Sequence, residues 1–466
     1  MIYVFTSAAW NYLPKAHLLA TTVKKHIPGA HMVLALPDQM TDDVDIGKYD
    51  FDEVMAMDEK LISVPKYKGW VFSHSIVELA TAIKPFVLCK LLERRDCEAV
   101  LYFDPDIMLF SDLNDMLDEF NHNSILLCPH VTIPEVNYQS IVDNELGSLK
   151  WGVYNFGYVG VKNDAYGYAF ANWWRDRCMQ WCYDDVANGI FTDQKWNDLV
   201  PGLFDGVKVL RSSRFDVAVW NTTRRKFSGS WEDGFKVNGE PLGFYHFTGF
   251  DSGAHDIMLQ RAMAPEVQRQ LTDWYRAQLK KAELDPLCQR PWAYRNYTDG
   301  TPIPKEHRAY YHTDPGVMDY FRDPYDVTSD ENNYRNWYFR NIKGTAKDIT
   351  CTAEAIRQSL TRQLEDQKMS FEKEKASLEA ELKTARLYAE AIRQSLTKQL
   401  EGQKMSFEKE KASFEVELKT ARFYYERKLY DFKVLKSELE GVRNSASWKL
   451  TKPLRLLKSV FVRGGR

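Results

Sequence analysis

The sequence predicts an α/β domain with a mostly parallel sheet flanked by helices, followed by a long α-helical coiled coil. Short apolar runs alternate with amphipathic segments over residues 1–255, which is typical of strands and helices that form such a sheet. Residues 350–440 are rich in Glu, Lys, Gln, Leu and Ala and contain almost no Gly or Pro. With 466 residues, 44 % of them apolar, the chain is long enough for two or three domains with a large core.

Seven apolar runs in the first region are expected to form strands. They are residues 2–5, 32–36, 54–57, 100–103, 125–128, 155–161 and 244–247. Amphipathic patterns predict helices over residues 16–26 and 75–92, and over 264–282 in the region that follows.

An acidic pair follows the apolar run at 100–103: Asp104 and Asp106, separated by Pro105. Carboxylates within an apolar stretch destabilise the fold unless a partner compensates their charge. Their hard oxygen atoms suit Mg²⁺ or Mn²⁺, which in turn hold phosphate oxygens. In open α/β sheets, ligands gather outside the carboxyl ends of the strands. The pair therefore predicts a Mn²⁺ or Mg²⁺ site for a diphosphate, and a turn-capping pair is the alternative.

Composition excludes some classes of protein. The net charge of −3 gives no overall attraction to nucleic acid. The aromatic content of 14 % suits sugar binding by stacking, although an aromatic-rich core would also explain it. The seven scattered cysteines do not form a disulfide framework and fit a reducing cytoplasm. We expect no signal peptide and no membrane span, because the first residues enter a strand and no run of 18 apolar residues exists.

The C-terminal half divides into three further regions. Residues 256–349 are rich in Tyr, Trp, Pro and Asp, and we expect an extension packed on the first domain rather than a poorly ordered linker. Residues 350–440 contain a repeat of 36 residues with apolar positions seven apart, which predicts a coiled coil and a homo-oligomer; a solitary charged helix is the alternative. The basic amphipathic tail at 441–466 predicts a membrane-surface anchor, with docking to a partner protein as the alternative.

Several motifs in residues 1–255 resemble those of GT-A nucleotide-sugar glycosyltransferases, in particular the group of glycogenin and the lipopolysaccharide galactosyltransferases. The matching elements are, in chain order, Thr6-Ser7-Ala8 with Asn11-Tyr12, the helix that carries Lys84, Asp104-Pro105-Asp106, Asn155-Phe156-Gly157, Asp193-Gln194, Asn221, and His246 with Gly249. Phe156 stands where the family has Ser. The coiled coil and the end of the chain, with Trp448 and Pro453, resemble the tails of bacterial surface-polysaccharide glycosyltransferases.

The resemblance implies a role for each motif. Residues 6–8 with Asn11 and Tyr12 would hold the nucleotide. Asn155, Gly157, Asn221 and Gly249 would lie against the sugar or the acceptor. His246 would complete the metal site with Asp104 and Asp106, although a single histidine is often a buried core residue.

Asp193 and Gln194 are the candidate catalytic residues. Asp193 would orient a sugar hydroxyl or stabilise positive charge at the anomeric carbon, and an N-cap is its alternative. Gln194 would bond the sugar. Lys84 would face the nucleotide phosphates or orient Asp104, and a solvated helix face is the alternative. The resemblance also implies retention of anomeric configuration.

We therefore expect a cytoplasmic glycosyltransferase, peripheral at the inner face of the plasma membrane. It would move a hexose from a nucleotide sugar, expected to be UDP-linked, to a growing bacterial cell-surface glycan or a lipid-linked acceptor. The alternative is a non-catalytic glycan-binding or length-controlling scaffold. A nucleotidyltransferase ranks lower, because residues 6–12 contain no glycine or basic residue.

Overall fold

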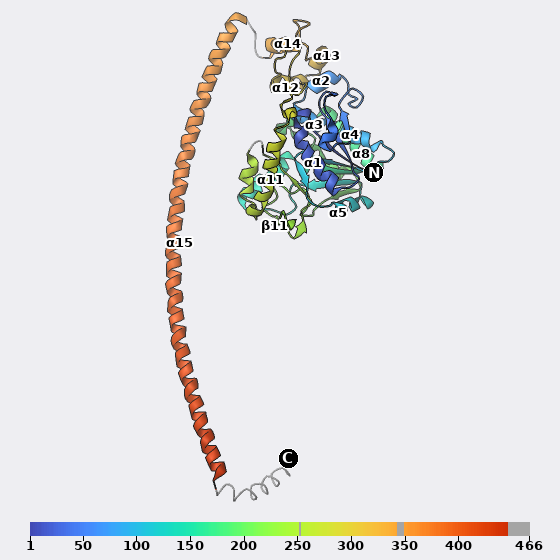
Figure 1. Ribbon diagram of the computed structural model, residues 1–466. Coiled ribbons are helices and arrows are strands. Elements are labelled where there is room, and N and C mark those ends of the chain that lie inside the picture. Colours follow the sequence, from blue (N-terminus) through green and yellow to red (C-terminus); the bar gives the residue numbers. More distant parts are fainter. Residues whose placement is uncertain (251–252, 343–348, 446–466) are drawn as a thin grey trace. The chain divides into compact units, whose positions relative to one another are not determined.

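The computed structural model describes residues 1–250, 253–342 and 349–445, and the side chains of 1–250, 253–342, 375–376 and 378–445 (Figure 1). The chain forms two units, Met1–Ala346 and Lys347–Arg466. The domain boundaries given above stay predictions.

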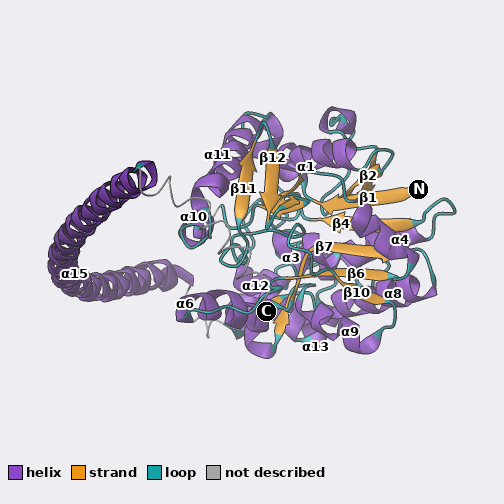
Figure 2. Ribbon diagram, turned by 90° about the horizontal axis from the view of Figure 1, so that it is seen from below, coloured by secondary structure: helices purple, strands orange, loops and turns teal. Residues whose placement is uncertain are grey.

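A seven-stranded sheet with the order β10-β6-β7-β4-β1-β2-β3 forms the centre of the first unit (Figure 2). Its strands are β1 (Ile2–Ser7), β2 (His31–Leu36), β3 (Glu53–Ala56), β4 (Ala99–Phe103), β6 (Ile125–Pro129), β7 (Tyr154–Lys162) and β10 (Val207–Val209). Strand β7 runs antiparallel to β4 and β6, whereas the other neighbours pair in parallel. The predicted mostly parallel sheet is confirmed.

Helices cover both faces of this sheet because its strands are apolar on both sides. Along β1, Val4 packs in one core cluster with α1 (Leu13–His26) and α11 (Pro265–Ala282). The adjacent Tyr3 and Phe5 pack in the other cluster, with α3 (Ile76–Ala82), α4 (Lys84–Leu92) and α8 (Ala165–Gln180). This alternation follows from the two-residue period of a strand.

The helix predicted over residues 75–92 is two helices in the structure. Helix α3 ends at Ala82, and α4 begins at Lys84 with a proline in its first turn. Pro85 has no N–H to continue the preceding helix, but its fixed φ suits the start of a new one. The break places Lys84 at the first position of α4, close to the carboxyl end of β4.

Smaller elements complete the first unit. The remaining strands are β5 (Ile107–Leu109), β8 (Asp184–Asp185), β9 (Ile190–Phe191), β11 (Phe227–Ser230), β12 (Gly234–Val237), β13 (Glu240–Pro241) and β14 (Phe244–His246). The remaining helices are α2 (Tyr67–Phe72), α5 (Asn114–Asp118), α6 (Tyr138–Ser140), α7 (Gly147–Trp151), α9 (Val200–Leu203), α10 (Ala254–Leu259), α12 (Lys305–Thr313), α13 (Pro315–Tyr320) and α14 (Tyr334–Asn341), with short 3₁₀ or π turns between them.

The aromatic residues after α11 form a third core cluster, which includes Phe72 of α2. The side chain of Arg308 donates to the carbonyls of Phe72 at 2.9 Å and His74 at 3.1 Å. Trp292 donates through Nε1 to the carbonyl of Pro37 at 2.8 Å. Residues 292–338 therefore pack against the part of the unit that carries the sheet.

The second unit contains one continuous helix, α15 (Ile349–Asn444), of 96 residues (Figure 1). At 1.5 Å per residue it extends over about 140 Å. Its described side chains from residue 378 onward are exposed. The tail predicted as a membrane anchor lies outside the described residues from 446 onward. None of the helices in the described part combines the length and apolar character of a membrane span.

Candidate active site

The acidic pair lies in the turn between β4 and β5. Strand β4 ends at Phe103, Asp104 and Asp106 follow, and β5 begins at Ile107. Strand β14 pairs antiparallel with β5, which sets His246 opposite Ile107. The N–H of Asp104 donates to the carbonyl of Gly157 at 2.7 Å, so β7 fixes the turn as well. Segments 140 residues apart in sequence thus meet at the carboxyl edge of the sheet.

Asp104, Asp106 and His246 bring their ligand atoms within 4.8 Å of one another. Nε2 of His246 lies 3.1 Å from Oδ1 of Asp106 and 3.9 Å from Oδ2 of Asp104. The carboxylates are 27 % and 23 % exposed, so they reach solvent, whereas the imidazole is 6 % exposed. Two carboxylate oxygens and one imidazole nitrogen at this spacing fit a divalent cation such as Mn²⁺ or Mg²⁺.

Charge within this cluster shifts the pKa of two of its groups. Burial alone would raise the pKa of Asp106, but the adjacent His246 outweighs burial and lowers it. Burial alone would lower the pKa of His246, but Asp106 and the neighbouring carboxylates raise it well above its usual value. The raised pKa of His246 reflects the negative charge of the carboxylates around it, which also favours a bound cation.

A cavity of about 260 Å³ opens beside Asp106. Tyr12, Lys15, Gly249 and Phe250 line it, with other residues of α11 and the segment after β14. Lys15, which the sequence analysis did not single out, adds a positive charge to its wall. An aromatic ring and a cation beside a metal site suit a nucleoside diphosphate.

The other residues predicted to hold the nucleotide lie at the end of β1. The hydroxyls of Thr6 and Ser7 are buried and have no hydrogen-bond partner among the described residues. Buried hydroxyls without a hydrogen-bond partner destabilise the fold, and they mark a place where a ligand or water can donate or accept a hydrogen bond. Ala8 is buried and donates its N–H to the carbonyl of Ala35 at 3.1 Å. Asn11 is half-buried and does not line the cavity.

Lys84 is the centre of a buried charge network. Its ammonium lies 3.2 Å from Asp104 Oδ1 and 3.2 Å from Asp193 Oδ2, and it donates to the carbonyl of Phe156 at 3.2 Å. Burial alone would lower the pKa of Lys84, but the two carboxylates raise it. The side chain is 4 % exposed, so a solvated helix face does not describe Lys84. Tyr102 adds a hydrogen bond to the same oxygen of Asp104.

Asp193 and Gln194 follow Thr192, whose φ of +45° is unusual for a residue other than glycine. Asp193 is 3 % exposed, and burial raises its pKa despite the nearby Lys84. It does not cap a helix: the following 3₁₀ turn has Gln194 at its N-cap position. Gln194 accepts the N–H of Phe156 at 3.0 Å and donates to the carbonyl of Trp151 at 3.1 Å.

Asn155 and Gly157 lie in the first half of β7, behind His246. Oδ1 of Asn155 lies 3.2 Å from Nδ1 of His246 and accepts the N–H of Gly157 at 2.9 Å. The side chain of Asn221 bonds backbone groups, including the carbonyls of Asp216 at 2.8 Å and His130 at 3.1 Å. It therefore shapes the wall of the site.

Asp216 was not singled out by the sequence analysis. It is fully buried, and its Oδ1 lies 3.7 Å from Nδ1 of His246. No motif marks this residue, because it reaches the site from a loop with no regular pattern around it.

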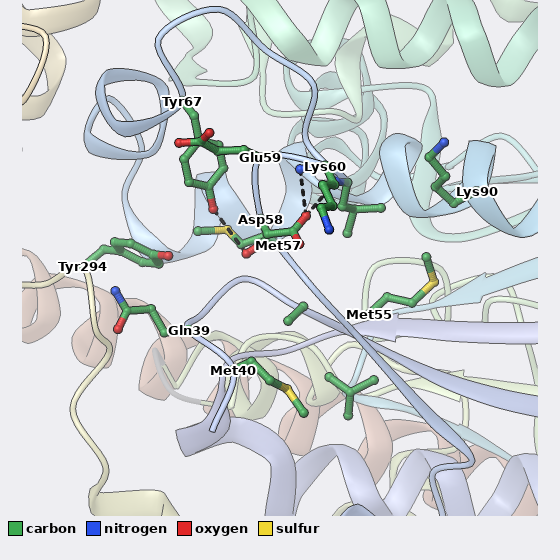
Figure 3. Close-up of a pocket in the computed structure, with 13 residues that line it drawn as sticks. Gln39, Met40, Met55, Met57, Asp58, Glu59, Lys60, Tyr67, Lys90 and Tyr294 are labelled. Carbon is green, nitrogen blue, oxygen red and sulfur yellow. Dashed lines mark hydrogen bonds between the residues drawn. The ribbon is translucent and has the colours of Figure 1, made fainter. Parts of the chain in front are cut away.

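Larger pockets also occur among the described residues, and two of them are relevant here. One, of about 620 Å³, is lined by His130, Trp151, Trp220 and Arg261 among others, and Trp220 packs edge-on to His246 with ring centroids 5.3 Å apart. The other, of about 810 Å³, lies along the edge strand β3 beneath Tyr67 and Tyr294 (Figure 3). None of the predicted site residues lines this second pocket.

Two curated proteins are similar in sequence to this chain, and neither has an assigned activity. No protein-family model matches the chain. It is 30 % identical over 177 residues to the uncharacterized protein YfnF of Bacillus subtilis, and 29 % identical over 176 residues to the uncharacterized protein YfnD of the same organism. Each match covers 37 % of this chain, and the chain spans 57 % of YfnF and 54 % of YfnD.

Among solved structures, the chain is similar to glycosyltransferases. The galactosyltransferase LgtC, in complex with donor and acceptor sugar analogs, is 16 % identical with a TM-score of 0.33, over 66 % of this chain and 99 % of LgtC. Mouse xyloside xylosyltransferase 1 is 12 % identical with a TM-score of 0.33, over 53 % of this chain and 98 % of that enzyme. The likeness to these GT-A enzymes concerns the fold.

Proposed function

We propose that the chain is a metal-dependent glycosyltransferase that moves a hexose from a nucleotide sugar, a UDP-sugar in our proposal, to a growing bacterial cell-surface glycan. The observation that carries this proposal is the convergence of Asp104, Asp106 and His246 at the carboxyl edge of the sheet. A cation held by these three side chains would neutralise the charge that develops on the departing diphosphate.

The residues around this cluster support the donor side of the reaction. Tyr12 would stack on the base, and Lys15 would face the phosphates in the cavity beside Asp106. Lys84 holds Asp104 in position through an ion pair, and it forms a second ion pair with the buried Asp193. Asp193 would bond a hydroxyl of the donor sugar, and Gln194 would fix the backbone around it. Retention of anomeric configuration is part of the proposal.

The pocket of about 620 Å³, whose lining residue Trp220 packs on His246, supports an acceptor sugar. Trp151 and Trp220 offer aromatic faces on which a pyranose ring stacks. The carbonyl of Trp151 accepts a hydrogen bond from Gln194, so this side of the pocket contacts a proposed catalytic residue directly.

Two further parts of the proposal concern assembly. The exposed apolar side chains of α15 support a homo-oligomer formed by coiled-coil contacts. We propose that the basic tail at 441–466 binds the inner face of the plasma membrane, close to a lipid-linked acceptor. Deletion of residues 441–466 tests this in a sedimentation assay with anionic liposomes, where unchanged binding would refute the anchor.

The central experiment incubates the purified full chain with a set of UDP-sugars and Mn²⁺, with and without EDTA. We expect transfer or donor hydrolysis that EDTA abolishes. The variants Asp104→Asn and Asp106→Asn should each lower kcat by at least about 100-fold, which is typical when a group that stabilises charge in the transition state is removed. The matched control is Asp118→Asn on α5, an exposed aspartate that is not part of the cluster. Absence of both activities with every donor would refute the proposal.

The long helix α15 favours a second candidate, a non-catalytic scaffold that binds glycan. The double substitution Asp104→Ala with Asp106→Ala separates the two functions in cells. A scaffold keeps its cellular function after this change, whereas a transferase loses it.

A further inference from the structure

A buried carboxylate lies on the far side of the His246 imidazole from the acidic pair. Nε2 of His246 faces Asp106 at 3.1 Å, and Nδ1 faces Asp216, with Oδ1 of Asp216 3.7 Å away. Asp216 is 0 % exposed, and neither of its carboxylate oxygens has a hydrogen-bond partner within 3.5 Å in the described part of the chain. Burying a carboxylate in this state is energetically unfavourable, so the position of Asp216 calls for a compensating role.

The backbone of Asp216 is held in an uncommon conformation. Its φ is +46°, in the left-handed region that residues other than glycine rarely adopt. Asn221 donates to the carbonyl of Asp216 at 2.8 Å, and the N–H of His246 donates to the carbonyl of Val217 at 2.8 Å. Strain of this kind persists only where surrounding contacts enforce it, and it concentrates at functional sites.

Buried Arg225 is the other charged group near Asp216, but it does not pair with the carboxylate. Its Nη1 donates to the carbonyl of Phe215 at 2.8 Å and to the carbonyl of Asp216 at 3.4 Å. Its Nε has no partner in the described residues. Arg225 therefore braces the loop through backbone groups and leaves the carboxylate directed at His246.

A histidine that binds a metal through Nε2 carries its proton on Nδ1. Both groups that face Nδ1 of His246 are oxygen acceptors: Asn155 Oδ1 at 3.2 Å and Asp216 Oδ1 at 3.7 Å. Asn155 Oδ1 already accepts the N–H of Gly157, so it is only a shared acceptor. We propose that Asp216 is a positioning residue that, with Asn155, holds the Nδ1–H tautomer of His246 and aims Nε2 at the metal.

This inference rests on the metal site of the proposed function. Partners of this kind orient a ligating imidazole and increase its basicity, and their loss typically weakens metal binding by 10- to 100-fold. Asp216 thus acts on the metal through His246 rather than by direct contact.

The test measures Mn²⁺ binding to the full chain by electron paramagnetic resonance of the free ion, together with the melting temperature. We expect Asp216→Asn to raise the Kd for Mn²⁺ by about 10- to 100-fold. Asparagine tolerates the same left-handed backbone, and Asp216→Gly is a second variant that fits it and removes the carboxylate. The matched control is Asp38→Asn, another buried aspartate, which accepts backbone N–H groups and should leave Kd unchanged.

A double-mutant cycle with His246→Ala gives the deciding result. If Asp216 acts through His246, Asp216→Asn changes Kd by less than about threefold in the His246→Ala background. An equal loss in both backgrounds, or no loss in the single variants, overturns the inference. A wild-type chain that binds no Mn²⁺ would instead refute the metal site itself, so the two failures are distinguishable.

Discussion

Gly157 and His246 are in close contact: a β carbon added to Gly157 would lie 2.5 Å from Cε1 of His246 and 2.8 Å from its Nδ1. Real β carbons do not approach other atoms so closely, so any other residue at 157 would displace the imidazole. The glycine that the sequence motif marks is therefore required by the position of the proposed metal ligand.

Gly157→Ala should weaken Mn²⁺ binding by at least tenfold, because the imidazole must rotate away from Asp106. It should also destabilise the chain by about 1–3 kcal/mol, the usual cost of overpacking a buried site. Titration with Mn²⁺ and urea unfolding measure the two effects. Gly202→Ala is the control, because nothing lies within 4 Å of a β carbon there. Unchanged Mn²⁺ affinity in Gly157→Ala would contradict the prediction.

Lys84→Met should destabilise the first unit by about 3–5 kcal/mol, the cost of removing one partner of a buried ion pair. The loss leaves Asp193 buried with no counter-ion, since Lys84 is its ion-pair partner at 3.2 Å. Urea unfolding followed by tryptophan fluorescence measures the change.

The double variant Lys84→Met with Asp193→Asn provides the check on this reasoning. Removing the uncompensated carboxylate should restore part of the lost free energy of unfolding. If the double variant is no more stable than Lys84→Met alone, the ion pair is not the cause of the loss.

Much of the fold follows from sequence pattern because strands buried on both faces leave continuous apolar runs. The acidic pair could be placed for the same reason: it directly follows the run that forms β4. The role of Lys84 was harder to predict. The break before Pro85 sets the direction of the Lys84 side chain, and an amphipathic helix pattern does not reveal that break.

Asp216 and Lys15 show what the sequence could not reveal. Asp216 reaches His246 only because it adopts a φ of +46° in an irregular loop, and this loop runs alongside β14 through the bridge between Val217 and Tyr245. Lys15 lies in an ordinary amphipathic helix, and only the cavity beside Asp106 distinguishes it from a surface lysine. Contacts between distant segments create both roles, and no local pattern records them.

Trp151→Ala should raise the KM for the acceptor by about tenfold, the loss of roughly 1.4 kcal/mol from one stacking contact. The KM for the donor should change by less than about twofold, because Trp151 lines the pocket on the acceptor side. Steady-state kinetics with each substrate varied in turn separates the two constants. Trp181→Ala is matched in exposure, 43 % against 41 %, and lies outside the pocket. Equal effects on both KM values would argue against an acceptor site here.

The stability of the first unit should decrease as the pH falls below about 6.5, and His74 should account for part of this loss. Burial lowers the pKa of His74 below its usual value of 6.5. The unfolded chain therefore binds the proton first as the pH falls, and the free energy of unfolding drops by up to about 1.4 kcal/mol per pH unit until the folded pKa is reached. His74 packs against Tyr183, which stacks on His312 of α12, so this loss loosens the contact with the aromatic segment.

The comparison of wild type with His74→Gln isolates this contribution, because buried His130 and His255, whose pKa values are also lowered, act in the same direction. Urea unfolding at pH 7.5, 6.0 and 5.0 should show a shallower pH dependence in the variant. Parallel curves for the two proteins would mean that His74 is protonated equally in the folded and unfolded states.

The full chain of 54.3 kDa should be an oligomer in light scattering at micromolar concentration. The described apolar side chains Leu378 and Ile392, and then Leu400, Phe407 and Phe414, which resume the seven-residue spacing eight residues after Ile392, are each at least 55 % exposed on α15. A helix of this length with such a stripe gains most of its stability from association. The triple substitution Ile392→Glu, Leu400→Glu and Phe407→Glu should give a monomer, whereas Lys398→Glu, outside the stripe, should not. A monomeric wild-type chain would refute the predicted homo-oligomer.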